Sequence, residues 1–108
     1  MVQKTAQIKN LELATKFKKK IGKSIDLDRF ILFGSRAGSG FRQDSDFDLL
    51  IISKDFEKIP WYKRAGRFYL MWDEDYPLEI LCYTPEEIER RKGKVGIISE
   101  AMQKGVEI

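Results

Sequence analysis

Residues 29–52 read RFILFGSRAGSGFRQDSDFDLLII, and this stretch decides the fold. Its two ends, 29–33 and 46–52, are apolar runs of the kind that form buried strands. Gly34 ends the first run, and the polar loop over 35–45 carries glycines at positions 38 and 40. The stretch therefore predicts two successive strands that are joined by an irregular loop.

The segment before this stretch predicts an amphipathic helix from about Thr5 to Ile21, with Gly22 as a stop. Apolar residues recur there at three- and four-residue spacing, on one helical face. They are Ile8, Leu11, Ala14, Phe17 and Ile21. The other face carries Lys16 and the run 18–20, without the interleaved aromatic residues of a nucleic-acid surface. We expect the lysine face to be solvated.

The segment after this stretch predicts further helices and one more strand. Pro60 can open a helix with an apolar stripe that we expect in the core. The stripe consists of Trp61, Ala65, Phe68 and Trp72. Residues 78–83 predict a third strand, residues 84–87 carry the capping signals of a new helix, and residues 95–108 predict a short last helix. This order indicates a single α/β (α+β) domain over residues 1–108, with helices packed on a small mixed sheet.

The composition excludes several functional classes. The chain lacks histidine, which excludes histidine-based nucleophile systems and imidazole zinc sites. Its 20 basic and 17 acidic residues give too small an excess to indicate a nucleic-acid partner. No apolar run is long enough for a signal peptide or a membrane span, so we expect a cytoplasmic protein with no membrane partner. The lone Cys82 has apolar neighbours, which favour a buried small residue.

Asp46 and Asp48 are the first candidate site residues. Side chains alternate along a strand, so two carboxylates separated by one residue project to the same side. Their mutual repulsion is relieved by a cation, and Mg²⁺ prefers oxygen ligands of this kind. An exposed turn would explain the pair equally well if it stood alone. Gly34 and Ser35 stand close by in the sequence, however, and they can form a phosphate cradle through backbone amides and a hydroxyl.

Glu79 is a third candidate carboxylate, at the start of the third predicted strand. If that strand lies beside the second one, Glu79 can complete a metal-binding triad with Asp46 and Asp48. In two-metal phosphoryl transfer, one ion orients the triphosphate and the other activates the attacking hydroxyl. An exposed strand glutamate without a catalytic role is the alternative, and the sequence alone does not decide between them.

Three motifs together resemble the minimal nucleotidyltransferase family of the polymerase-beta superfamily. They are GSRA at 34–37, SDFDL at 45–49, and LEI at 78–80 followed by TPEE at 84–87. The resemblance covers about residues 29–91 and implies a small mixed sheet with packed helices. It also implies that Gly34 and Ser35 bind the triphosphate and that Asp46, Asp48 and Glu79 are metal-binding and catalytic carboxylates.

The resemblance further implies an enzyme that transfers a nucleoside monophosphate, most often AMP from ATP, with two Mg²⁺ ions as cofactors. Many relatives act as antitoxins that modify a tyrosine of a helical HEPN-domain partner. An inactive antitoxin that neutralises its partner by binding is the alternative, and a small-molecule nucleotidyltransferase is a third. The sequence assigns neither the nucleotide base nor the oligomeric state.

Arg36 and two other positions leave questions open within this resemblance. Arg36 matches the arginine that follows the serine, and we expect it to bind the nucleotide phosphates; bracing the sheet through an internal ion pair is the alternative. Relatives usually continue with Arg-Gly where Gly38 and Ser39 stand here, so one potential phosphate cation is missing. The third carboxylate is more often aspartate, and the extra methylene of Glu79 moves the carboxylate by more than about 1 Å.

Overall fold

The centre of the protein is a four-stranded sheet with the strand order β3-β2-β1-β4. In this computed structural model, which describes residues 2–108 and side chains from residue 5 onward, the strands are β1 (Arg29–Phe33), β2 (Phe47–Ile52), β3 (Leu78–Tyr83) and β4 (Val106–Glu107). β1 runs antiparallel to β2 and β4, and β3 runs parallel to β2. A mixed sheet covered by helices is the fold that the sequence predicts.

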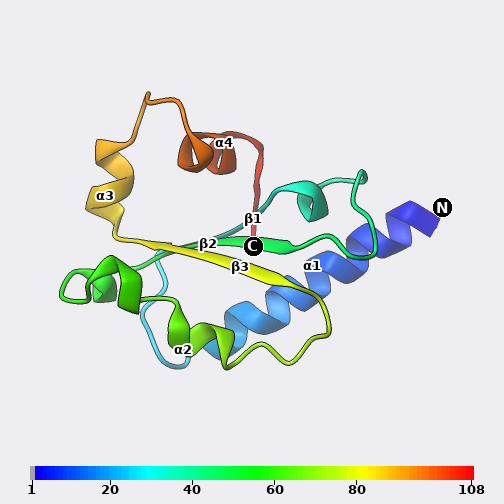
Figure 1. Ribbon diagram of the computed structural model, residues 1–108, viewed down its shortest axis with the longest axis horizontal. Helices are drawn as coiled ribbons and strands as arrows, with labels where there is room; N and C mark the ends of the chain where they lie inside the picture. Colours follow the sequence, from blue (N-terminus) through cyan, green and yellow to red (C-terminus); the bar gives the residue numbers. More distant parts are fainter. Residues whose placement is uncertain (1) are drawn as a thin grey trace.

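Helices cover both faces of the sheet. Figure 1 shows α1 (Val2–Ile21) and α2 (Gly66–Tyr69) on one side, with α3 (Pro85–Arg90) and α4 (Ile97–Lys104) on the other. Strand residues alternate between a larger core against α1 and a smaller core against α4. Leu50 and Ile52 of β2 belong to the smaller core, so Asp48 lies on the same face as α4.

The helix predicted near the N-terminus is present, but its predicted apolar stripe is buried only from Ala14 onward. Ala14, Phe17 and Ile21 pack against the sheet, whereas Ile8 and Leu11 are 49% and 36% exposed. The first turns of α1 extend past the end of the sheet (Figure 1).

The lysine face of α1 is more than a solvated surface. The Nζ of Lys18 donates to the carbonyl oxygen of Ile108, and that of Lys20 forms an ion pair with Asp73 at 2.5 Å. These contacts connect α1 to the C-terminus and to the loop before β3, so the expectation of a solvated face was incomplete.

The prediction of one continuous helix after Pro60 is wrong. A 3₁₀ turn, η3 (Trp61–Lys63), is followed by the single turn of α2. Phe68 is buried as expected, but Trp61 is 78% exposed. Ala65 and Trp72 pack against the same core as Phe68, so Trp61 is the member of the stripe that the prediction misplaces. Arg64, between the two short turns, is buried and bonds to Ile59, Cys82 and Glu87.

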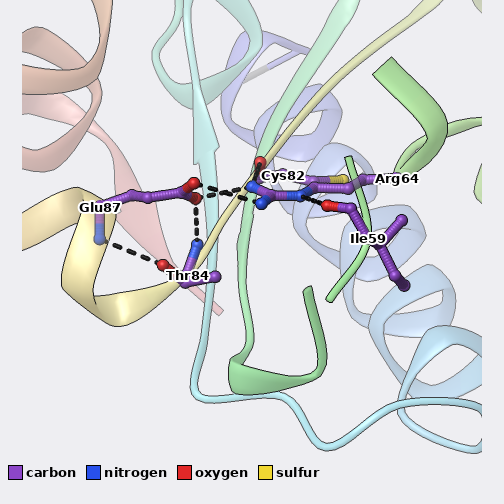
Figure 2. A network of polar contacts seen from close by, with 5 residues as sticks. All are labelled: Ile59, Arg64, Cys82, Thr84 and Glu87. Carbon is purple, nitrogen blue, oxygen red and sulfur yellow. Dashed lines mark hydrogen bonds and ion pairs between the residues drawn. The ribbon is translucent and has the colours of Figure 1, made fainter. Parts of the chain in front are cut away.

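Figure 2 shows how Arg64 connects this segment to β3 and α3. Its guanidinium donates to the carbonyl oxygens of Ile59 and Cys82 and forms an ion pair with Glu87 at 2.6 Å. Glu87 also accepts from the backbone amide of Thr84, and the hydroxyl of Thr84 accepts from the amide of Glu87. The predicted capping box is therefore confirmed, and Arg64 holds it against the edge of the sheet.

Cys82 has the environment that the sequence predicts. Cys82 is buried, and burial raises the pKa of its thiol to about 12, which agrees with a structural role. Within residues 2–108, no helix is long and apolar enough to cross a membrane.

Candidate active site

The chain leaves β1 through a glycine that lies directly against a carboxylate. Gly34 has a φ of 73°, and a Cβ at this position would overlap the Oδ2 atom of Asp48. Phe33, the preceding residue, is paired with Asp48 across the antiparallel ladder. A side chain at position 34 would therefore fill the space above the Asp48 carboxylate, and glycine keeps that space open.

Asp48 and Glu79 lie opposite each other on neighbouring strands. The parallel register of β2 and β3 pairs the two residues directly, which confirms the predicted strand adjacency. Leu81 and Tyr83 of β3 pack against the α4-side core, so by alternation Glu79 faces the same side as Asp48. Glu79 is exposed and Asp48 is half-buried.

Asp46 lies just before β2 rather than within it. The strand begins at Phe47, whose amide donates to the carbonyl oxygen of Pro77, one residue later than the predicted start. Asp46 is exposed, and its charge still acts on Asp48. The two aspartates thus stay close together at the entrance of the strand.

The surroundings of Asp48 disfavour its negative charge. Burial raises the pKa of Asp48 to about 6, and the charges of Asp46 and Glu79 add to the rise. No hydrogen bond or ion pair to these three carboxylates is present among residues 5–108. A bound cation would offset this concentration of negative charge.

The donor set suits Mg²⁺, but the three carboxylates do not form a ready-made metal cage. Within the described part of the chain, no three Asp, Glu or Cys side chains are gathered closely enough to hold an ion together. Mg²⁺ usually takes only one or two protein carboxylates and completes its octahedron with phosphate oxygens and water. Asp46 and Asp48, with the open space beside Gly34, fit that requirement.

A cavity of about 310 Å³ opens beside Asp48, between the end of β1 and α4. The strand side contributes Phe33, Gly34 and Asp48. The helix side contributes Ile97, Glu100, Ala101 and Lys104. Sequence reasoning missed the helix side, because the spacing of these four residues shows that they share a face but not that the face meets Asp48.

Ser35 and Arg36 begin the 3₁₀ turn η1 (Ser35–Ala37), where they have different environments. Ser35 is exposed, and its hydroxyl makes no hydrogen bond with the described residues. It is therefore free to contact a ligand beside Gly34, as the sequence predicts.

Arg36 is only 3% exposed and supports the loop from inside. Its guanidinium donates to Asn10 Oδ1 at 3.0 Å and to the carbonyl oxygens of Gln43 and Ser45 at 2.9 and 2.8 Å. It also stacks over Phe47 and Tyr76, 4.6 and 4.5 Å from the ring centroids.

This geometry favours the bracing role that the sequence left open for Arg36. The brace acts through carbonyl oxygens and aromatic rings rather than through an ion pair. By holding the loop that ends at Asp46, Arg36 fixes the start of β2 and positions the aspartates indirectly.

Comparisons with known proteins identify the family to which this chain belongs. Residues 8–106 match the family model described as nucleotidyltransferase domain. A Methanocaldococcus jannaschii protein, provisionally named a protein adenylyltransferase, is 34% identical over 91% of this chain and 97% of its own length. A crystal structure of a provisionally assigned nucleotidyltransferase from Sulfolobus solfataricus matches with a TM-score of 0.69 at 20% identity, covering 99% of this chain and 86% of that one. That structural likeness concerns the fold, whereas the family model and the 34% identical relative establish that this chain belongs to the nucleotidyltransferase family.

Proposed function

We propose that this nucleotidyltransferase transfers AMP from ATP to a hydroxyl group of a protein. The observation that carries the proposal is the position of Asp48, which lies beneath the open turn at Gly34, beside Asp46 and opposite Glu79. The name of the Methanocaldococcus jannaschii relative supports both the adenylyl group and the protein acceptor.

Asp46 and Asp48 would hold Mg²⁺ through carboxylate oxygens, and Gly34 and Ser35 would bind the phosphates through amides and a hydroxyl. We propose two ions, as the resemblance implies, with Glu79 contributing to the second. Bound Mg²⁺ supplies positive charge that neutralises the triphosphate and lowers the pKa of an acceptor hydroxyl. The half-buried position of Asp48 on a strand would keep these groups in a fixed geometry.

The proposed transfer is an in-line substitution at the α-phosphorus of ATP. The acceptor oxygen forms a bond to phosphorus, the bond to the β-phosphate bridging oxygen breaks, and pyrophosphate leaves. The proton of the acceptor hydroxyl must go to a base, and Glu79 is the exposed carboxylate that faces the same side as Asp48. Glu79 therefore takes either the proton or the second ion in this proposal.

We propose a tyrosine of a HEPN-domain partner as the acceptor and an antitoxin role for this chain, on the basis of the sequence resemblance. A phenol with a pKa near 10 is a weak nucleophile at neutral pH, so it depends on a base or a metal ion at the site. The rival proposal is an antitoxin that binds its partner without transfer. The sequence favours this rival at one point, because Gly38 and Ser39 stand where relatives usually carry Arg-Gly, so one potential phosphate cation is missing.

The test is the intact mass of the partner after incubation with this protein, ATP and Mg²⁺. We expect an increase of one AMP on a tyrosine, released pyrophosphate in equal amount, and loss of both with the Asp46→Asn, Asp48→Asn double variant. Asp75→Asn, in an exposed turn, is the matched control that should keep the activity. An unmodified partner in a stable, silenced complex would support binding without transfer.

Glu79 has its own test within this assay. If Glu79 is catalytic, Glu79→Gln loses transfer while Mg-ATP still raises the melting temperature, because ligand binding stabilises the native state independently of the chemical step. Glu79→Asp would retain or improve turnover. Equal rates for all three proteins would remove Glu79 from the site.

A further inference from the structure

A lysine from the end of the chain lines the same cavity as Asp48. Lys104 is the last residue of α4, and it faces the 310 Å³ cavity together with Gly34 and Asp48. Its side chain is 76% exposed and forms a loose ion pair with Glu100 at 3.7 Å, one helical turn earlier. The ammonium group is thus available to a ligand that enters the cavity.

The backbone after Lys104 fixes this end of α4 against β1. A Cβ at the next residue, Gly105, would lie 2.5 Å from Cγ2 of Ile31 and 3.1 Å from the carbonyl oxygen of Leu32, both in β1, so only glycine fits this closely against the strand. The following residue, Val106, pairs with Leu32 in the ladder between β4 and β1. The backbone of Lys104 is therefore held close to Leu32 of β1. Its position does not depend on a mobile tail.

A triphosphate and the three carboxylates together carry more negative charge than the two proposed Mg²⁺ ions offset, so a further cation would favour binding. Asp46, Asp48 and Glu79 are all negative, and ATP adds negative charges on its β- and γ-phosphates. Arg36 cannot approach these phosphates, because its guanidinium is buried and bonded to loop carbonyls. Among the described residues that line the cavity, Lys104 is the cation.

We infer that Lys104 binds the β- and γ-phosphates of the nucleotide, so that α4 forms one wall of a triphosphate site whose other wall is Gly34 and Asp48. This inference rests on the proposed function. Glu100, which also lines the cavity, holds the Lys104 ammonium in the free protein and repels a phosphate. It therefore weakens nucleotide binding.

Calorimetric binding of Mg-ATP, Mg-ADP and AMP to the full chain tests this inference. We expect Lys104→Ala to weaken Mg-ATP binding about 10-fold, which is the range for one hydrogen-bonded charge, and to leave AMP binding within about twofold. Lys104→Arg should recover part of the loss, and Glu100→Gln should bind Mg-ATP more tightly than the parent. Because Lys104 is exposed, the variants should unfold at the same temperature as the parent.

Lys58→Ala is the matched control. Lys58 is exposed and follows the end of β2 that lies opposite the Asp48 end, so its loss should leave all three affinities unchanged. If Lys104→Ala weakens ATP and AMP equally, or leaves both affinities unchanged, Lys104 does not bind the β- and γ-phosphates. In that case the proposed function still stands if binding depends on Asp48. If the parent binds no Mg-ATP, both proposals fail together.

Discussion

Replacing Asp48 by asparagine should stabilise the ligand-free protein at neutral and higher pH. Asparagine keeps the shape of the side chain and removes the negative charge that its surroundings disfavour. The pKa of Asp48 rises from 3.8 to about 6, chiefly through burial and then through Asp46 and Glu79. A rise of about 2 in pKa corresponds to about 3 kcal/mol in the free energy of unfolding. Because Asp48 is only half-buried and water screens its neighbours, we expect about 1–2 kcal/mol.

The sign of the pH dependence follows from the same pKa. Because the folded-state pKa of Asp48 lies above its unfolded value, the folded protein holds this proton more tightly. The associated stability is complete below about pH 3.8 and is lost as the pH rises through about 6. The stability of the variant relative to the parent should therefore be near zero at pH 4 and reach its full value by about pH 7.5.

Urea unfolding of both proteins at several pH values between 4 and 8 measures this difference, without metal or nucleotide. At pH 7.5 the expected gain also raises Tm by about 5 °C or more, as is usual for a domain of this length. Asp75→Asn, in an exposed turn, should show no such pH-dependent gain. A variant less stable than the parent at pH 8, or a constant difference from pH 4 to 8, would refute the origin assigned to the raised pKa.

Substitutions at Gly34 and Arg36 and alkylation of Cys82 test the structure around the site. Gly34→Ala should lower the free energy of unfolding by about 1–3 kcal/mol in urea, because φ is 73° and the new Cβ overlaps Asp48; unchanged stability would contradict this close approach. Arg36→Ala should cost about 3 kcal/mol or more, and Arg36→Lys should not restore it, because lysine lacks the planar set of donors; a variant with parental stability would exclude the bracing role. With a pKa of about 12, Cys82 should resist iodoacetamide at pH 8 and react once urea unfolds the chain, and rapid native alkylation would show that the thiol is accessible.

Three of the four strands were predictable because local apolar runs encode them, whereas the two-residue β4 was not predicted. β1 and β3 have the predicted bounds, and β2 begins one residue later than predicted. β1 and β2 lie in the centre of the sheet and are buried on both faces, so their apolar runs are a strong local signal, whereas β3 is an edge strand with only two fully buried residues. The capping box at Thr84 is local in the same sense, and it was also predicted correctly.

The errors concern residues whose roles are set by distant contacts. The apolar spacing from Trp61 predicts one continuous helix, but the segment forms two short turns. Arg64, between these turns, bonds to Ile59, Cys82 and Glu87, and a local pattern does not reveal these contacts. Arg36 had two chemically reasonable roles in the sequence. The role that Arg36 takes depends on its contacts with Asn10 and with the loop carbonyl oxygens. The GSRA motif does not identify these partners.

The candidate site was predictable in part, since Asp46, Asp48 and Glu79 were found from spacing and strand adjacency. The α4 wall was not predictable, because it depends on two close backbone approaches that a sequence pattern does not reveal. Gly34 lies against the Asp48 carboxylate, and Gly105 lies against Ile31 of β1, each where a Cβ would collide. These two contacts bring the exit of β1 and the end of α4 to the same cavity, although about 70 residues separate them in sequence. Any substitution that opens either contact should therefore move a wall of the site as well as lower stability, which makes nucleotide affinity a sensitive measure of how closely the sheet and α4 are joined.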